Sequence, residues 1–68
     1  MLKQINIRCG QKIRVEREKQ KLLQRELADI AGVPVRTIGR IERGEVDVRL
    51  GTVKKIADAL GVAVRDLV

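Results

Sequence analysis

The hydrophobic residues of this chain recur at helical rather than alternating spacing, and Gly32, Gly44 and Gly61 divide the pattern into segments. The pattern predicts four helices and a short fifth one. They are expected at residues 6–19, 23–31, 34–42, 50–60 and 64–68. No linker, repeat or low-complexity tract interrupts them, so the sequence indicates one compact all-α domain that spans residues 1–68.

The second predicted helix has one apolar face and a clear end. Four of its residues recur at i, i+4, i+7 and i+8, namely Leu23, Leu27, Ile30 and Ala31. Gly32 follows directly, and glycine accepts the left-handed backbone of a helix end because it has no Cβ. The helix is therefore expected to stop sharply at Gly32.

Only Gly32 and Val33 separate this helix from the next one, which Pro34 opens. A connection this short forces the two helices to meet at a tight angle. Two short helices joined in this way are typical of the helix-turn-helix, which presents its second helix to the major groove of DNA. Short turns also occur in other helical bundles, so the spacing alone leaves the function open.

The charge of the chain points to a polyanionic partner. Fifteen Lys and Arg residues against nine Asp and Glu residues give a formal net charge of +6. The longest stretches without a charged residue, 30–35 and 59–64, are too short to span a bilayer. Residues 1–10 also lack the apolar core of a signal peptide, so we expect no membrane partner and a cytoplasmic location.

Several residue types that catalysis and metal binding need are missing. The chain has no histidine and no serine, and its single cysteine, Cys9, excludes an intrachain disulfide and a cysteine-rich metal site. We therefore expect no catalytic residue, metal or cofactor, and interpret Cys9 as a small buried side chain. The chain also has no aromatic residue on which unpaired bases could stack, which favours double-stranded DNA as the ligand.

The order of these residues resembles the Cro and phage-repressor (XRE) family of helix-turn-helix domains. The resemblance covers about residues 10–67 and rests on the segments IRVEREKQKLLQRELADIAGVP, RTIGRIERGE and LGTVKKIADALGVAVRDL. It implies a lambda-repressor-like fold of four to five helices and a transcriptional regulator, expected to be a repressor. It also implies a homodimer on a palindromic operator, without a cofactor.

The resemblance places the base-reading positions on Val35, Arg36 and Arg40 of the third predicted helix. Arg36 and Arg40 are four residues apart and share one helix face, so both can donate to guanine O6 and N7 in one major groove. Val35 can contact a thymine methyl group. In the alternative interpretation, the two arginines only neutralise phosphates.

The resemblance also implies contacts with the DNA backbone at Gln24, Thr37 and Arg43, and we expect Arg49 to add a further one. Lys54 and Lys55 can extend this basic surface, whereas Glu45 and Asp47 weaken its attraction for DNA. Gly39 lies inside the third helix, where glycine costs about 1 kcal/mol relative to alanine. It either clears space for DNA or replaces a small polar residue without consequence.

The family pairs an arginine of its first helix with the glutamate that ends its third helix, which implies an ion pair between Arg17 and Glu42. The alternative is two separate surface charges. If the pair is partly buried, neither charge can be left alone without a large loss of stability.

This chain departs from the family at its helix starts, where a Ser or Thr usually caps the helix. The cap positions hold Leu23, Pro34, Arg49 and Ala63. Each missing cap costs about 1 kcal/mol. Lys21 also stands where a glycine frequently ends the first helix. We therefore expect a marginally stable monomer.

Apolar residues near the C-terminus offer a way to stabilise that monomer. These residues are Val62, Val64, Leu67 and Val68. We expect them to form the interface of a dimer. In the alternative interpretation, they close the core of the monomer.

A different class of function remains open from the sequence. The chain could be an antitoxin that binds a toxin, or a controller protein of a restriction-modification system, with partner binding beside DNA binding. An enzyme is the least supported class, since no catalytic constellation can be identified.

Overall fold

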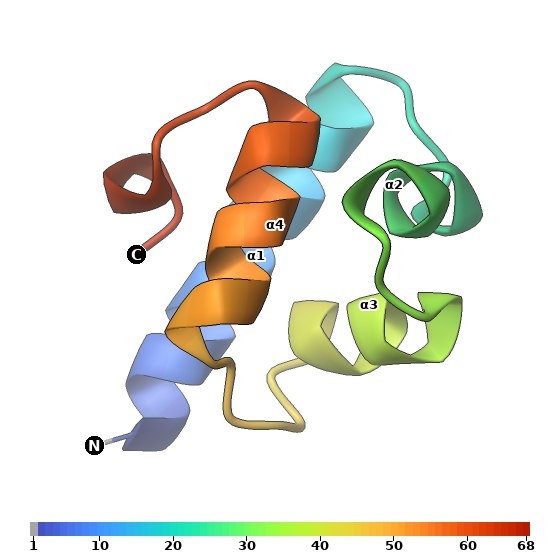
Figure 1. Cartoon of the computed structure of the whole chain (residues 1–68). Coiled ribbons are helices and arrows are strands. Elements are labelled where there is room, and N and C mark those ends of the chain that lie inside the picture. Colours follow the sequence, from blue (N-terminus) through green and yellow to red (C-terminus); the bar gives the residue numbers. More distant parts are fainter. Residues whose placement is uncertain (1) are drawn as a thin grey trace.

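Four α-helices and one short 3₁₀ turn make up the fold, and residues 2–68 contain no strand. The computed structural model describes the backbone of residues 2–68 and the side chains of residues 6–68. The elements are α1 (Leu2–Lys19), α2 (Gln24–Ala31), α3 (Val35–Glu42), α4 (Leu50–Leu60) and η1 (Val64–Asp66), as Figure 1 shows. The expected all-α class is confirmed.

The helix bounds agree with the sequence pattern to within one residue, except at the two ends of the chain. α4 has the predicted bounds, and α2 and α3 each begin one residue later than predicted. α1 begins at Leu2 rather than at residue 6, since residues 2–5 contain neither glycine nor proline to stop it. The predicted helix at 64–68 is a single 3₁₀ turn, Val64–Asp66.

The helix starts lack side-chain caps, as the sequence predicts. No side-chain cap bond forms at the four N-cap residues, which are Leu23, Pro34, Arg49 and Ala63. At two of these starts, the backbone N–H of the N-cap residue instead donates to a carboxylate three residues later in the sequence. The Glu26 carboxylate accepts the Leu23 N–H at 2.8 Å, and the Asp66 carboxylate accepts the Ala63 N–H at 3.1 Å.

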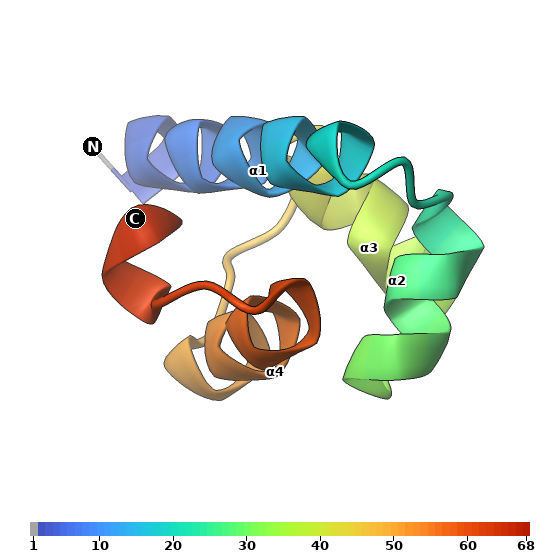
Figure 2. The ribbon, with the colours of Figure 1, turned by 90° about the horizontal axis from the view of Figure 1, so that it is seen from above.

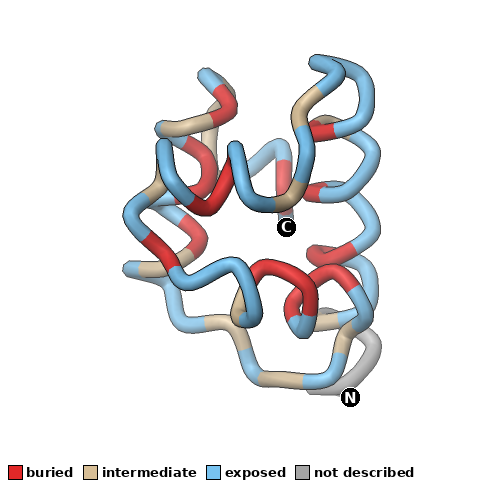
Figure 3. The backbone as a smooth tube through the Cα atoms, turned by 90° about the vertical axis from the view of Figure 1, so that its right-hand side faces the viewer, coloured by how far each residue is buried: buried red, intermediate tan, exposed pale blue. Residues whose placement is uncertain are grey.

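The helices pack around one aliphatic core. α3 packs against α1 and α2, while α4 packs against α2, α1 and η1 (Figures 1 and 2). The buried positions of each helix turn inward (Figure 3). The largest fully buried side chains are those of Ile13, Leu27, Ile38, Ile41, Ile56 and Leu67.

The apolar face predicted for the second helix is partly wrong. Leu27 is fully buried, but Ile30 and Leu23 are 59% and 55% exposed. Successive helical residues are about 100° apart, so Ile30 lies to one side of a face that points Leu27 and Ala28 into the core. Ala28 is buried there beside Leu27.

The turn between α2 and α3 depends on Gly32. Its φ of +69° is left-handed, and the Val33 N–H that follows donates to the Ala28 carbonyl at 3.0 Å. Val33 is buried and anchors the corner in the core. Lys21 has a similar φ of +59°, in agreement with its position where the family frequently has glycine.

The first helix approaches α3 closely at Gly10. A Cβ at this position would lie 2.1 Å from the Ile41 carbonyl oxygen and 3.1 Å from that of Glu42. The missing side chain therefore sets the distance between α1 and the end of α3. Cys9 beside it is buried, which confirms its interpretation as a core residue, and burial raises the pKa of its thiol.

The C-terminal residues are buried in the core of the monomer to a greater extent than the sequence predicts. Leu67 is 1% exposed and belongs to the core, so its assignment to a dimer interface is wrong. Val62 and Val64 are half-buried against the same core, and Val68 is exposed. The Lys12 ammonium group donates to the Val68 carbonyl at 2.9 Å, which ties the end of the chain to α1.

Among the helices of residues 2–68, none has both the length and the apolar character needed to cross a membrane.

Candidate nucleic-acid interface

The outer face of α3 is a stripe of arginines. Arg36, Arg40 and Arg43 follow one another at i, i+4 and i+7, and all three are exposed. Ile38 and Ile41 lie on the opposite face and are buried in the core. The helix is therefore held by its apolar face and presents guanidinium groups to the outside.

Two arginines of this stripe have no acidic partner among the side chains that the structure describes. Among residues 6–68, no carboxylate forms an ion pair with Arg36 or Arg40, whereas other basic side chains do have such partners. Val35, at the start of the same helix, is 47% exposed. The three residues predicted to read bases thus lie on the accessible part of α3.

On one side of the stripe, Gln24 and Arg43 meet above Gly39. A Cβ at Gly39 would lie 3.2 Å from Arg43 Nη1 and 3.7 Å from the amide atoms of Gln24. These two side chains cover the glycine, which is buried. The space beside Gly39 is thus filled by two residues with predicted backbone contacts, and is not left open for DNA.

Replacing Gly39 with alanine is expected to stabilise the fold. A glycine within a helix is less stable than alanine by roughly 0.5–1 kcal/mol, and only the flexible end of Arg43 must shift by a few tenths of an ångström. For a domain of this size, 1 kcal/mol corresponds to a rise in Tm of about 4–8 °C. Thermal unfolding followed by circular dichroism measures it, and a lower Tm would show that the contact is rigid.

Below this side of the interface lies the predicted ion pair. Arg17 Nε and Nη2 donate to Glu42 Oε2 and Oε1 at 2.7 and 3.0 Å, and both residues are 8% exposed. Arg17 Nη1 also donates to the Leu22 carbonyl at 2.7 Å. The hydrogen bond to Glu42 raises the pKa of Arg17. The structure thus contains a bidentate pair instead of two separate surface charges.

The ion pair also fixes Gln24. The Gln24 side-chain amide donates to Glu42 Oε1 at 3.1 Å, so α1, α3 and the start of α2 meet at one carboxylate. An amide nitrogen carries two donors, and Glu42 engages one of them. The other remains available to a phosphate oxygen, beside the N-terminus of α2.

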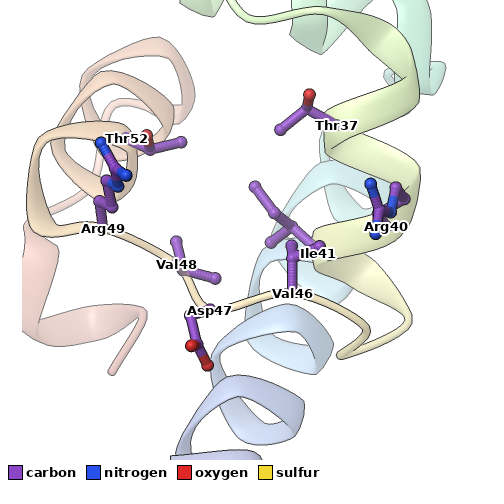
Figure 4. A pocket seen from close by; sticks show the side chains of 8 residues that line it. All are labelled: Thr37, Arg40, Ile41, Val46, Asp47, Val48, Arg49 and Thr52. Carbon is purple, nitrogen blue, oxygen red and sulfur yellow. The ribbon is translucent and has the colours of Figure 1, made fainter.

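On the other side of the stripe, a groove of about 330 Å³ separates α3 from the start of α4 (Figure 4). Its floor is apolar and its walls are polar. It is lined by Thr37, Arg40, Ile41, Val46, Asp47, Val48, Arg49 and Thr52. Thr37 and Arg40 come from α3, and Arg49 and Thr52 from the start of α4, so two arginines face one channel from opposite walls.

The start of α4 adds to the positive character of this groove. Its N-cap residue is Arg49, no side chain caps it, and its first turn contains no acidic residue. The first N–H groups of a helix have no partner within it and favour an anion. With Arg40 and Arg49 on its walls, the groove has the chemistry to hold a sugar-phosphate strand.

The loop that forms one edge of the groove is tied to α1 by Asn6. Asn6 Nδ2 donates to Asp47 Oδ1 at 2.7 Å, and its Oδ1 accepts the Val48 N–H at 3.4 Å. Sequence reasoning missed this residue, because a contact across forty-one positions leaves no trace in helical periodicity. In the same loop, Gly44 has a φ of +72° and packs directly on Ile7 of α1.

The exposed Arg43 has an acidic partner. Arg43 Nε donates to Glu45 Oε2 at 2.6 Å, which raises the pKa of Arg43 and lowers the pKa of Glu45.

Of the two lysines of α4, Lys54 pairs with Asp58 at 3.6 Å, while Lys55 is exposed on the same helix. Within the described residues, no group of acidic or cysteine side chains could hold a metal ion.

Comparison with known proteins agrees with this geometry. A family model described as helix-turn-helix matches residues 13–67. An uncharacterized HTH-type transcriptional regulator of Sinorhizobium fredii, y4mF, is 36% identical over 55 residues, which are 81% of this chain and 72% of that protein. The crystal structure of the restriction-modification controller protein C.AhdI from Aeromonas hydrophila is similar with a TM-score of 0.90 and 33% identity, over 93% of this chain and 96% of that one. The chain belongs to the XRE-type helix-turn-helix family of DNA-binding transcriptional regulators.

Proposed function

We propose that this chain is a sequence-specific repressor that binds a palindromic operator as a homodimer. In this proposal each α3 enters a major groove, and the two half-sites lie roughly 10 bp apart. Arg36, Arg40 and Val35 contact base edges, and the backbone contacts come from Gln24, Thr37, Arg43 and Arg49.

The observation that supports this proposal most is that Arg36 and Arg40, on the exposed face of α3, form no ion pair with any carboxylate of residues 6–68. Guanidinium groups without a carboxylate partner keep their donors for a ligand, and two of them on one face fit the O6 and N7 acceptors of guanine. The groups predicted to contact the backbone flank this stripe on both sides. Gln24 lies on one side, and Thr37 and Arg49 line the groove on the other.

Three alanine variants test the division of roles. We expect Arg36→Ala and Arg40→Ala to cost about 1–3 kcal/mol on the preferred site and to relax the preference at the base that each one reads. Arg43→Ala should weaken binding to all duplexes alike. Bound sequences are selected from a random duplex pool, and the affinities are then measured on the selected and on a scrambled duplex.

Equal losses on both duplexes for all three variants would contradict base reading. Arg40 is the most informative of the three, because it also forms a wall of the groove beside α4. A uniform loss for Arg40→Ala together with a selective loss for Arg36→Ala would assign Arg40 to the backbone and leave Arg36 as the reader.

The dimer requires apolar surface outside the core. With Leu67 buried, the C-terminal residues that can contribute are Val62, Val64 and Val68. Sedimentation of the free chain measures the association directly. A monomer at high micromolar concentration, with a Tm that does not change on dilution, would contradict the proposed homodimer.

A controller protein of a restriction-modification system is the second candidate function. It is favoured by the similarity to C.AhdI, which extends over nearly the whole of both chains. The two candidates share the DNA-binding face and differ in what they regulate. Restriction and methylation genes beside the gene for this chain would favour the controller.

A further inference from the structure

One carboxylate lies directly against the arginine stripe of α3. Glu45 follows the helix, and the main chain fixes its place. The Gly44 N–H donates to the Ile41 carbonyl at 3.0 Å, and the Glu45 N–H donates to the Arg40 carbonyl at 3.0 Å. This pair of bonds closes the helix end, so the Glu45 side chain starts from a defined position beside Arg43.

The carboxylate of Glu45 engages Arg43 with both oxygens. Arg43 Nε lies 2.6 Å from Glu45 Oε2, and Arg43 Nη2 lies 3.4 Å from Glu45 Oε1. The Arg43 hydrogen bond holds the pKa of Glu45 below its usual range, and the charges of Arg43 and Arg40 act in the same direction. The carboxylate therefore stays charged throughout the neutral pH range.

This position benefits neither the helix nor DNA binding. A negative charge at the C-terminal end of a helix interacts unfavourably with the helix dipole. An ion pair between side chains that are 57% and 47% exposed adds little to stability. A carboxylate next to a predicted phosphate contact also repels DNA.

The other carboxylate of this loop has a different kind of partner. Asp47 is bound by the neutral amide of Asn6, and no arginine among residues 6–68 forms an ion pair with it. Of the acidic residues in the loop, Glu45 alone forms an ion pair with an arginine of the stripe.

We propose that Glu45 holds Arg43 back from the phosphodiester backbone of duplex DNA and thereby lowers affinity without changing base preference. Binding then requires Arg43 to exchange the carboxylate for a phosphate. Because that exchange is the same on every duplex, its cost is common to all sequences. The inference rests on the proposed function, which makes α3 the DNA-binding helix.

The exchange has a signature in the salt dependence of binding. An arginine that neutralises a phosphate releases a counterion from DNA. In this chain, Glu45 loses Arg43 when DNA binds, and its free carboxylate then attracts a cation from solution. This uptake cancels part of the counterion release from DNA. Removing the carboxylate should therefore steepen the slope of log K against log salt by up to about 0.9.

The experiment compares Glu45→Gln with a matched control, Glu18→Gln. Glu18 accepts Arg14 Nε through its own Oε2 at 3.2 Å on α1, both of these side chains are exposed, and the change in net charge is the same. Glu18 Oε2 also lies 3.9 Å from Arg17 Nη2, so urea unfolding of Glu18→Gln checks that the Arg17–Glu42 pair is intact in the control. Arg43→Ala and the double variant Arg43→Ala/Glu45→Gln complete the set. Each protein is titrated with a random-sequence duplex and with the selected duplex at about 50 and about 200 mM salt.

We expect Glu45→Gln to bind both duplexes roughly twofold to fivefold more tightly than Glu18→Gln at the lower salt, with the steeper slope. In the Arg43→Ala background the advantage should disappear. Equal affinities for Glu45→Gln and Glu18→Gln would overturn the proposal, as would weaker binding or a changed base preference. If the wild-type chain ignores both duplexes, the proposed function itself fails, and this outcome is distinct from the others.

Discussion

Replacing Gly10 with alanine is expected to destabilise the fold by about 3 kcal/mol, at the upper end of the usual range for overpacking. The new Cβ would lie 2.1 Å from the Ile41 carbonyl oxygen, which belongs to the backbone and cannot turn aside as a flexible side chain can. α1 and the end of α3 must move apart instead. Urea unfolding followed by circular dichroism measures the loss.

Gly51→Ala provides the matched control. Gly51 also lies within a helix, α4, but a Cβ there meets nothing within 4 Å. Alanine should therefore be neutral or stabilising at this position. If Gly10→Ala were as stable as Gly51→Ala, the close approach of α1 to α3 would be wrong.

Arg17→Met is expected to cost about 3 kcal/mol, because it leaves the buried carboxylate of Glu42 without its cation. Stabilities of roughly 0.05–0.15 kcal/mol per residue are usual, so a loss of this size removes a large share of the total in a chain of 68 residues. The change also frees the carboxylate that holds Gln24. Urea unfolding of the variant measures the effect.

The double variant Arg17→Met/Glu42→Met distinguishes the cost of an unpaired buried charge from the cost of losing the ion pair itself. Replacing both members of a buried ion pair by apolar residues of similar volume is often neutral, so the double variant should recover much of the loss. A single Arg17→Met variant that unfolds at the same urea concentration as the wild type would show that the two charges act independently.

The sequence predicts those parts of the fold that local signals determine. The α4 bounds follow from an apolar face and the glycine after it, and the corner at Gly32 follows from a left-handed turn between two short helices. The family resemblance supplied the Arg17–Glu42 pair and placed Arg36 and Arg40 on the exposed face of α3. Each of these depends on residues near in sequence or on a known family pattern.

The remaining features depend on tertiary contacts. Nothing in the sequence distinguishes Gly10, which lets two helices approach closely, from Gly51, which faces open space. Ile30 fits an apolar stripe by spacing alone and lies outside the core, whereas Leu67 is drawn into it by the C-terminal turn. The role of Asn6 cannot be predicted from local patterns, because its partners lie more than forty residues away in the sequence.

Methylation of guanine N7 shows whether α3 reads DNA from the major groove. This atom is the acceptor in the major groove that Arg36 and Arg40 are expected to engage. We expect the wild-type chain to reject selected duplexes methylated at specific guanines, and Arg36→Ala to tolerate methylation at one of them. A bound fraction with methylated guanines at every position would show that α3 does not lie in the major groove.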